Sequence, residues 1–133
     1  MKRWLMAYLG TALAMCALDF VWLAWLSPDI YQQALGPILL VTPRMVPVVL
    51  FYLIYVAGVV VFGVKRGLEA DRVSVAAGYS ALFGFVAYAT YDLTNWATIS
   101  VFNGELVVID LAWGTVLSAI AGSCGCALAR GRV

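Results

Sequence analysis

The chain has 133 residues, of which 65% are hydrophobic and 11% are charged. Soluble domains contain roughly 45–50% and about 25% of such residues, and a soluble fold of this size still exposes about a third of its surface. We therefore predict that most of the chain is surrounded by lipid. Eight Lys and Arg residues stand against seven Asp and Glu residues, which excludes a nucleic-acid-binding protein that works through a basic surface.

The chain contains no histidine. This excludes His-ligated haem, His-containing zinc or di-iron sites, and Ser-His or Cys-His nucleophiles. Cys16, Cys124 and Cys126 show no CxxC spacing and are interpreted as small apolar packing residues. Retinal is not expected either, because Lys2 and Lys65 lie at helix ends and no lysine lies inside a span. The cofactor therefore stays unknown.

Four stretches are long and apolar enough to cross about 30 Å of hydrocarbon as helices. They cover about residues 4–26, 45–64, 74–98 and 106–129, and the whole of 1–133 is interpreted as one membrane domain. Because two of the three connections are short, neighbouring helices are expected to be antiparallel. The sequence thus predicts an all-α integral membrane protein, an antiparallel four-helix bundle.

Basic residues flank these spans unevenly. Only Arg44 lies on one side, and the other side carries Lys2, Arg3, Lys65, Arg66, Arg72, Arg130 and Arg132. The positive-inside rule therefore places both termini in the cytoplasm. The loop 65–72 is expected to be solvated there, and Asn103-Gly104 to form a turn on the outer side.

The first span is interpreted as a retained helix rather than a signal peptide. Signal peptides have an apolar region of about 7–15 residues, whereas this run is longer and contains Asp19. Residues 13–16 resemble a lipoprotein cleavage site only faintly, because Met15 stands where a small residue is expected.

The long outer connection, residues 27–44, is expected to lie along the membrane interface. Ser27, Pro28 and Asp29 supply a capping hydroxyl, a first-turn proline and an acid, which are typical of a helix start. The apolar residues of the short interfacial helix that follows are Ile30, Tyr31 and Leu35.

Three acids lie inside the predicted spans, where ionisable groups are costly and by default indicate a functional site. Asp19, Asp92 and Asp110 lie four to seven residues from the outer ends of their helices. At 1.5 Å per residue, all three come within about 6–11 Å of the outer boundary. Tyr52 falls at the same level, so every span contributes a polar side chain to one layer.

The other candidate site residues accompany this layer: Trp22, Tyr55, Tyr88, Tyr91, Asn95 and Trp113. Tyr88, Asp92 and Asn95 follow i, i+4, i+7 spacing and so share one helix face. The spacing Asp-x-x-Trp occurs twice, beginning at Asp19 and at Asp110. We therefore predict that antiparallel packing turns these side chains toward one another.

Three carboxylates gathered in a low-dielectric site cannot all ionise without a cation. Either some are protonated and donate hydrogen bonds to Asn95 and the tyrosines, which would make a proton reservoir, or Asp19, Asp92 and Asp110 hold a cation through oxygen ligands. The same side chains could instead serve only as interhelical hydrogen bonds that hold the bundle together. The sequence leaves these alternatives open.

Small residues recur every four positions along the fourth span, at Gly114, Ser118 and Gly122. Such a face allows another helix to approach closely. The neighbour is a helix of this chain, a second copy in a homodimer, or another membrane protein.

Several segments resemble a known family. They are Leu18-Asp19-Phe20-Val21-Trp22-Leu23, Tyr31 with Leu35-Gly36, Phe51-Tyr52-Leu53-Ile54-Tyr55 with Gly58, Tyr88-Ala89-Thr90-Tyr91-Asp92-Leu93-Thr94-Asn95-Trp96-Ala97-Thr98, and Asp110-Leu111-Ala112-Trp113-Gly114. Together they resemble the bacterial domain of unknown function 2177 family of predicted inner-membrane proteins, over nearly the whole chain. The resemblance implies a four-helix, multi-pass protein of the bacterial inner (cytoplasmic) membrane and carries no activity with it.

Three functions are compatible with the sequence. The first is binding of a small molecule, lipid or cation, with or without proton coupling, in a carboxylate and tyrosine pocket in the outer half of the bilayer. Transporter sites usually lie at the midplane, so this depth disfavours transport. The second is an accessory subunit of a larger membrane complex. The third is a lipid-modifying enzyme with paired Asp residues as acid and base, although no nucleophile with an adjacent base and no phosphate-binding loop is visible.

Overall fold

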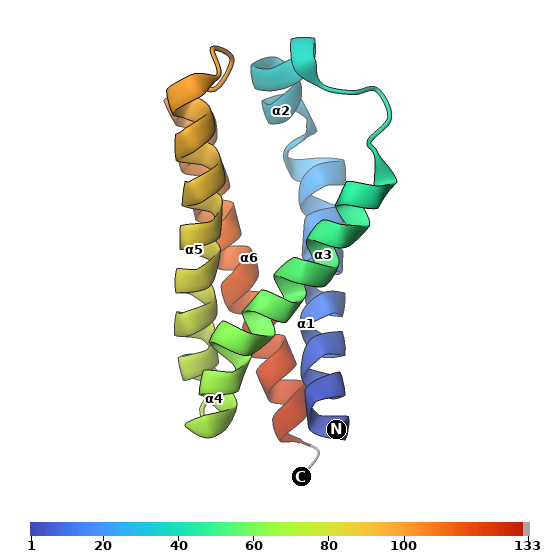
Figure 1. Ribbon diagram of the computed structural model, residues 1–133, viewed down its shortest axis with the longest axis vertical. Helices are drawn as coiled ribbons and strands as arrows, with labels where there is room; N and C mark the ends of the chain where they lie inside the picture. Colours follow the sequence, from blue (N-terminus) through green and yellow to red (C-terminus); the bar gives the residue numbers. More distant parts are fainter. Residues whose placement is uncertain (132–133) are drawn as a thin grey trace.

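The computed structural model describes residues 1–131, and within them it contains helices and no strand. Four helices are long and apolar enough to cross a membrane: Lys2–Leu26, Met45–Glu69, Val73–Thr98 and Gly104–Arg130. These findings confirm the prediction of an all-α protein with four spans. Successive spans run in opposite directions, and the first begins at the end of the molecule where the last one finishes (Figure 1). Arg132, counted among the flanking charges, lies outside the described residues.

The spans are assembled from several helical elements. In chain order these are α1 (Lys2–Val21), the π-helical turn η1 (Trp22–Leu26), α2 (Pro28–Leu35), the 3₁₀ turn η2 (Gly36–Ile38), α3 (Met45–Val59), the π-helical turn η3 (Val60–Val64), α4 (Lys65–Glu69), α5 (Val73–Thr98) and α6 (Gly104–Arg130). The first span is therefore α1 with η1, and the second is α3, η3 and α4 in one continuous run.

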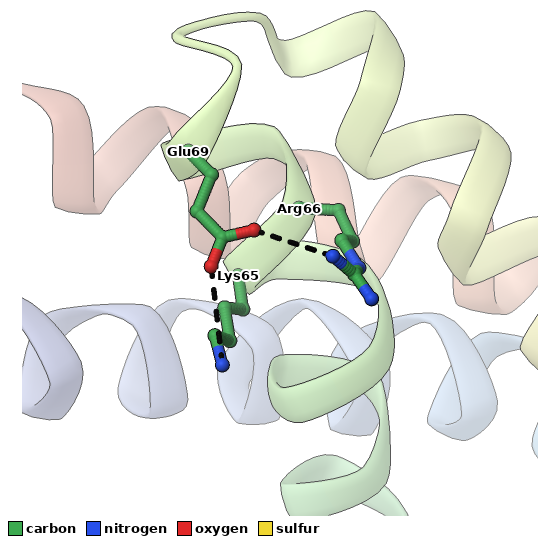
Figure 2. A network of polar contacts seen from close by, with 3 residues as sticks. All are labelled: Lys65, Arg66 and Glu69. Atoms are coloured by element: carbon green, nitrogen blue, oxygen red, sulfur yellow. Dashed lines mark ion pairs between the residues drawn. The ribbon is translucent and has the colours of Figure 1, made fainter.

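The second span is longer than the sequence suggested. The prediction of a solvated loop over 65–72 was wrong for its first part, because α4 continues the helix to Glu69. Glu69 pairs with Lys65 at 3.8 Å and with Arg66 at 3.6 Å (Figure 2). Opposite charges three and four residues apart stabilise an exposed helical turn, which explains how the helix continues beyond its apolar stretch.

The connection 27–44 contains the expected short helix, with Ser27 at its N-cap, Pro28 at its start and Asp29 in its first turn, but the predicted capping hydrogen bond is absent. The Ser27 hydroxyl does not cap α2; it donates to the Trp22 carbonyl oxygen at 2.8 Å and so closes the η1 turn. Leu35 is only 7% exposed and packs in a small apolar cluster with Phe102, Leu106 and Val107. Through this cluster α2 contacts the start of α6, and both lie at the same end of the molecule (Figure 1).

The α6 helix is the central element and packs along both α5 and α1. Close approach to α5 depends on glycine: a Cβ atom at Gly84 would lie 2.3 Å from the Gly114 carbonyl oxygen. Ser118 is fully buried, and a Cβ atom at Gly122 would meet Ser80 of α5. The small-residue face of α6 is therefore occupied by helices of this chain rather than open to a partner.

The outward faces of the spans are strongly apolar. Every span carries large apolar residues that expose more than half of their own surface, for example Leu13, Ile54, Val86 and Val108. Apolar exposure on this scale marks contact with a membrane or a partner, and the length of the four helices indicates lipid.

Candidate functional site

Asp19 joins three spans. It lies on α1 with 6% of its surface exposed. The Tyr52 hydroxyl on α3 donates to Oδ2 of Asp19 at 2.7 Å, and the Trp113 indole nitrogen on α6 donates to Oδ1 at 3.1 Å. Each carboxyl oxygen thus accepts one hydrogen bond and keeps one lone pair for a further donor.

Asp92 and Asp110 form a second site. Asp92 on α5 is fully buried, and its two oxygens receive no hydrogen bond from any donor in residues 1–131. The carboxyl group of Asp110 on α6 lies within hydrogen-bonding reach of it. Two carboxyl groups can bond to each other only if one carries a proton, so a single shared proton would satisfy this pair.

The Asp92–Asp110 pair is tied to α2 by Tyr31. The Tyr31 hydroxyl donates to Oδ1 of Asp110 and accepts a hydrogen bond of 3.2 Å from the Trp22 indole nitrogen. Burial, together with the bond to the Asp110 carboxylate, raises the pKa of Tyr31 above its ordinary value of 10.0. The phenol therefore stays a neutral donor throughout the physiological pH range.

Two stacked tryptophans connect the sites. The rings of Trp22 and Trp113 lie 4.4 Å apart between centroids at an angle of 7°. Trp22 bonds to Tyr31 of the second site, and Trp113 bonds to Asp19 of the first. The carboxyl groups thus lie in one connected network, but as a pair and a single residue rather than as one cluster.

The separation of Asp19 from the Asp92–Asp110 pair argues against one cation bound by all three acids. In the part of the chain that the structure describes, no three Asp, Glu or Cys side chains converge closely enough to hold a metal ion. A single cation held jointly by Asp19, Asp92 and Asp110 does not fit the arrangement, because antiparallel packing brings only the last two into contact.

A groove lies beside Asp19 and encloses about 400 Å³. Its lining residues come from all four spans and from α2; they are Asp19, Trp22, Leu23, Tyr31, Pro47, Val48, Phe51, Tyr52, Tyr88 and Trp113. A second groove of about 420 Å³ between α3 and α5 shares Phe51 and Tyr88 with the first and adds Tyr55, Ala87 and Tyr91. A mostly apolar groove that contains one carboxyl group therefore adjoins a second groove that contains none.

Of the remaining predicted site residues, some line a groove and others pack against neighbouring side chains. Tyr88 lines both grooves, and its ring occupies the space that a side chain at Gly114 would need. The Tyr55 hydroxyl is hydrogen-bonded to Ser118 at 2.8 Å and does not reach an acid. Tyr91 is 57% exposed and packs its ring on Phe102.

Asn95 is half-buried on α5. Among the described residues, the hydrogen bonds made to Asp19 and Asp110 come from tyrosine and tryptophan, and none comes from Asn95. The structure therefore leaves Asn95 outside the network of the acids, and its assignment to the site stays a prediction.

Sequence reasoning missed Tyr31 as a site residue. It was assigned to the apolar face of the interfacial helix, and its phenol reaches a carboxylate in a span 79 positions away in the sequence. One signal in the sequence could have identified Tyr31: it lies on a short amphipathic helix at the membrane interface, close in depth to the three acids. Depth counting within the spans could not include it, because α2 lies outside them.

Four apolar spans that enclose buried carboxyl groups define this chain as an integral membrane protein. A family model described as a predicted membrane protein (DUF2177) matches residues 4–127, and the chain belongs to this family. Comparisons with curated proteins and with solved structures gave no match.

Proposed function

We propose that this protein binds an amphipathic small molecule or a membrane lipid, with the polar end of the ligand at Asp19 and its apolar part between α3 and α5. The supporting observation is the groove of about 400 Å³, whose aromatic and apolar walls are interrupted by one buried carboxylate and a few phenols. Ligand sites typically enclose about 300–1,000 Å³, are mostly apolar and carry a few placed polar groups.

The adjoining apolar groove determines how such a ligand would lie. It runs between α3 and α5 and meets the first groove at Phe51 and Tyr88. In a lipid environment an acyl or alkyl chain can occupy a groove of this kind without leaving the hydrocarbon. The ligand could therefore enter sideways from the membrane rather than from water.

The proposed orientation follows from charge. Lys65 and Arg66 belong to α4 and Arg130 ends α6, and both of these helix ends lie at the end of the molecule opposite α2 (Figure 1). The positive-inside rule assigns that end to the cytoplasm, and the groove then lies in the outer half of the bilayer. A bacterial inner membrane is the proposed location, in line with the family resemblance.

Proton coupling is part of the proposal. The Asp92–Asp110 pair needs one proton to satisfy its buried oxygens, and Tyr31 and Trp22 link it to the wall of the groove. Infrared spectroscopy should show a protonated carboxyl band that disappears in Asp92→Asn. Persistence of that band in both Asp92→Asn and Asp110→Asn would mean that the proton resides elsewhere.

Native mass spectrometry of the purified protein tests the binding proposal. A retained lipid or small molecule is expected with the wild type. Val48→Phe places a ring in the groove and should remove the adduct, because Val48 lines the groove. Val49→Phe is the matched control, since Val49 is 51% exposed and faces away from the groove. Equal adducts in both variants, or a partner protein in place of any small ligand, would contradict the proposal.

A further inference from the structure

We infer that the polar end of the groove binds an organic ammonium group, so that the ligand is an amphiphile with a positively charged amine or quaternary ammonium head. This inference rests on the proposed function and specifies the chemistry of the ligand. It follows from three features of the groove: a carboxyl group with no basic side chain beside it, a wall of aromatic rings, and too few oxygen atoms to surround a metal ion.

The Asp19 carboxylate has no basic side chain beside it. Its two hydrogen bonds come from neutral donors, the Tyr52 hydroxyl and the Trp113 indole. No Lys or Arg lines the groove. The ion pairs of residues 1–131 all lie at the opposite end of the bundle, among the residues of Figure 2 and between Arg130 and Asp71. A cation brought by the ligand would supply the missing charge.

The groove walls suit an organic cation. Six of the ten lining residues are aromatic: Trp22, Tyr31, Phe51, Tyr52, Tyr88 and Trp113. Ammonium groups are attracted to the faces of such rings, and quaternary ammonium ligands are commonly recognised by aromatic cages. The Asp19 carboxyl group adds charge complementarity at one wall of the groove.

A metal ion fits the groove poorly. Hard cations such as Ca²⁺ take six to eight oxygen ligands, whereas only four lining side chains offer oxygen: Asp19, Tyr31, Tyr52 and Tyr88. Tyr31 and Tyr52 already donate to carboxylates. A quaternary ammonium group has no N–H donors and needs no oxygen shell, and a primary ammonium needs only a few acceptors, so walls that disfavour a metal suit an organic ammonium.

The apolar groove indicates what the ammonium group is attached to. Phe51 and Tyr88 border both grooves, and the second contains almost no polar surface beyond its phenols. A head seated at Asp19 would therefore direct an attached alkyl or acyl chain between α3 and α5. The expected ligand class includes ammonium-headed lipids and long-chain amines.

The test compares two chain-matched probes in maltoside micelles. One is dodecyltrimethylammonium, and the other carries a neutral tert-butyl group in place of trimethylammonium. Titration calorimetry should show the ammonium probe binding about tenfold more tightly to the wild type. Asp19→Asn should abolish this preference, and Asp29→Asn, which removes an exposed acid of α2 outside the groove, should retain it.

Aromatic variants provide a second test if Asp19→Asn does not fold. Trp113→Leu should reduce the preference for ammonium, whereas Trp25→Leu, at a residue that is 73% exposed, should not. Equal affinity of the two probes for the wild type would overturn the ammonium inference and leave amphiphile binding intact. If neither probe binds, and Val48→Phe changes nothing, the proposed function fails as well.

Discussion

The crossing of α5 and α6 can be tested at a single glycine, because the Asp92–Asp110 pair depends on how closely these helices approach. In Gly84→Ala, the new Cβ atom would lie 2.3 Å from the Gly114 carbonyl oxygen, about 1 Å short of the 3.4 Å at which ordinary contact begins. The obstacle is backbone and cannot rotate away, so the helices must separate. Overpacking of this kind costs about 1–3 kcal/mol.

Gly78→Ala is the matched control on the same helix, since no atom lies within 4 Å of the position where its Cβ would stand. It should leave stability unchanged or raise it by up to about 1 kcal/mol through helix propensity. Reversible unfolding in mixed micelles, followed by circular dichroism, measures both variants. Equal stability of the two would refute the packing of α5 on α6 described above.

Three further outcomes are expected from the end of the bundle that contains α2. Tyr31→Phe removes a hydrogen bond to a carboxylate, worth about 1.5–3 kcal/mol, and should raise hydrogen exchange in α2 about tenfold or more while leaving α6 protected. Asn103→Ala should lower the free energy of unfolding by about 1 kcal/mol, because the Asn103 side chain caps α6 by accepting from the Leu106 amide at 2.9 Å; Asn103→Asp should not. Since the pKa of Tyr31 is raised above 10.0, its contribution to the docking of α2 should persist at all pH values below 10 and disappear only as pH rises through the raised pKa. An alkaline absorbance titration checks this, because Tyr31→Phe should lose one of the tyrosines that ionise above pH 10.

The spans could be predicted because lipid imposes one strong condition, a long apolar helix. Their ends were harder to predict, because polar interactions determine them. Glu69 prolongs the second span through ion pairs, and Asn103 begins the last one through its cap. Hydropathy does not detect either effect.

The candidate site was partly predictable for a related reason. Helix rise alone placed Asp19, Asp92 and Asp110 at one depth, and the structure buries all three. The rotation of each helix about its own axis decides which side chains face one another. This rotation depends on packing at positions such as Gly84 and Gly114. Counting along the chain therefore could not show that the acids divide into a pair and a single residue.

The chemistry of Asp19 distinguishes a purely structural role from a binding role. An asparagine in its place could accept from the Trp113 indole and donate its amide to the Tyr52 hydroxyl, which can also act as an acceptor. Both interhelical bonds could therefore be made without a buried charge, and such bonds contribute only about 0.6–2 kcal/mol each in membranes. A neutral amide at position 19 could therefore hold α1, α3 and α6 together. Asp19→Asn should accordingly keep the fold and lose the ligand, whereas loss of the fold together with unaltered ligand binding in any folded fraction would favour a structural role.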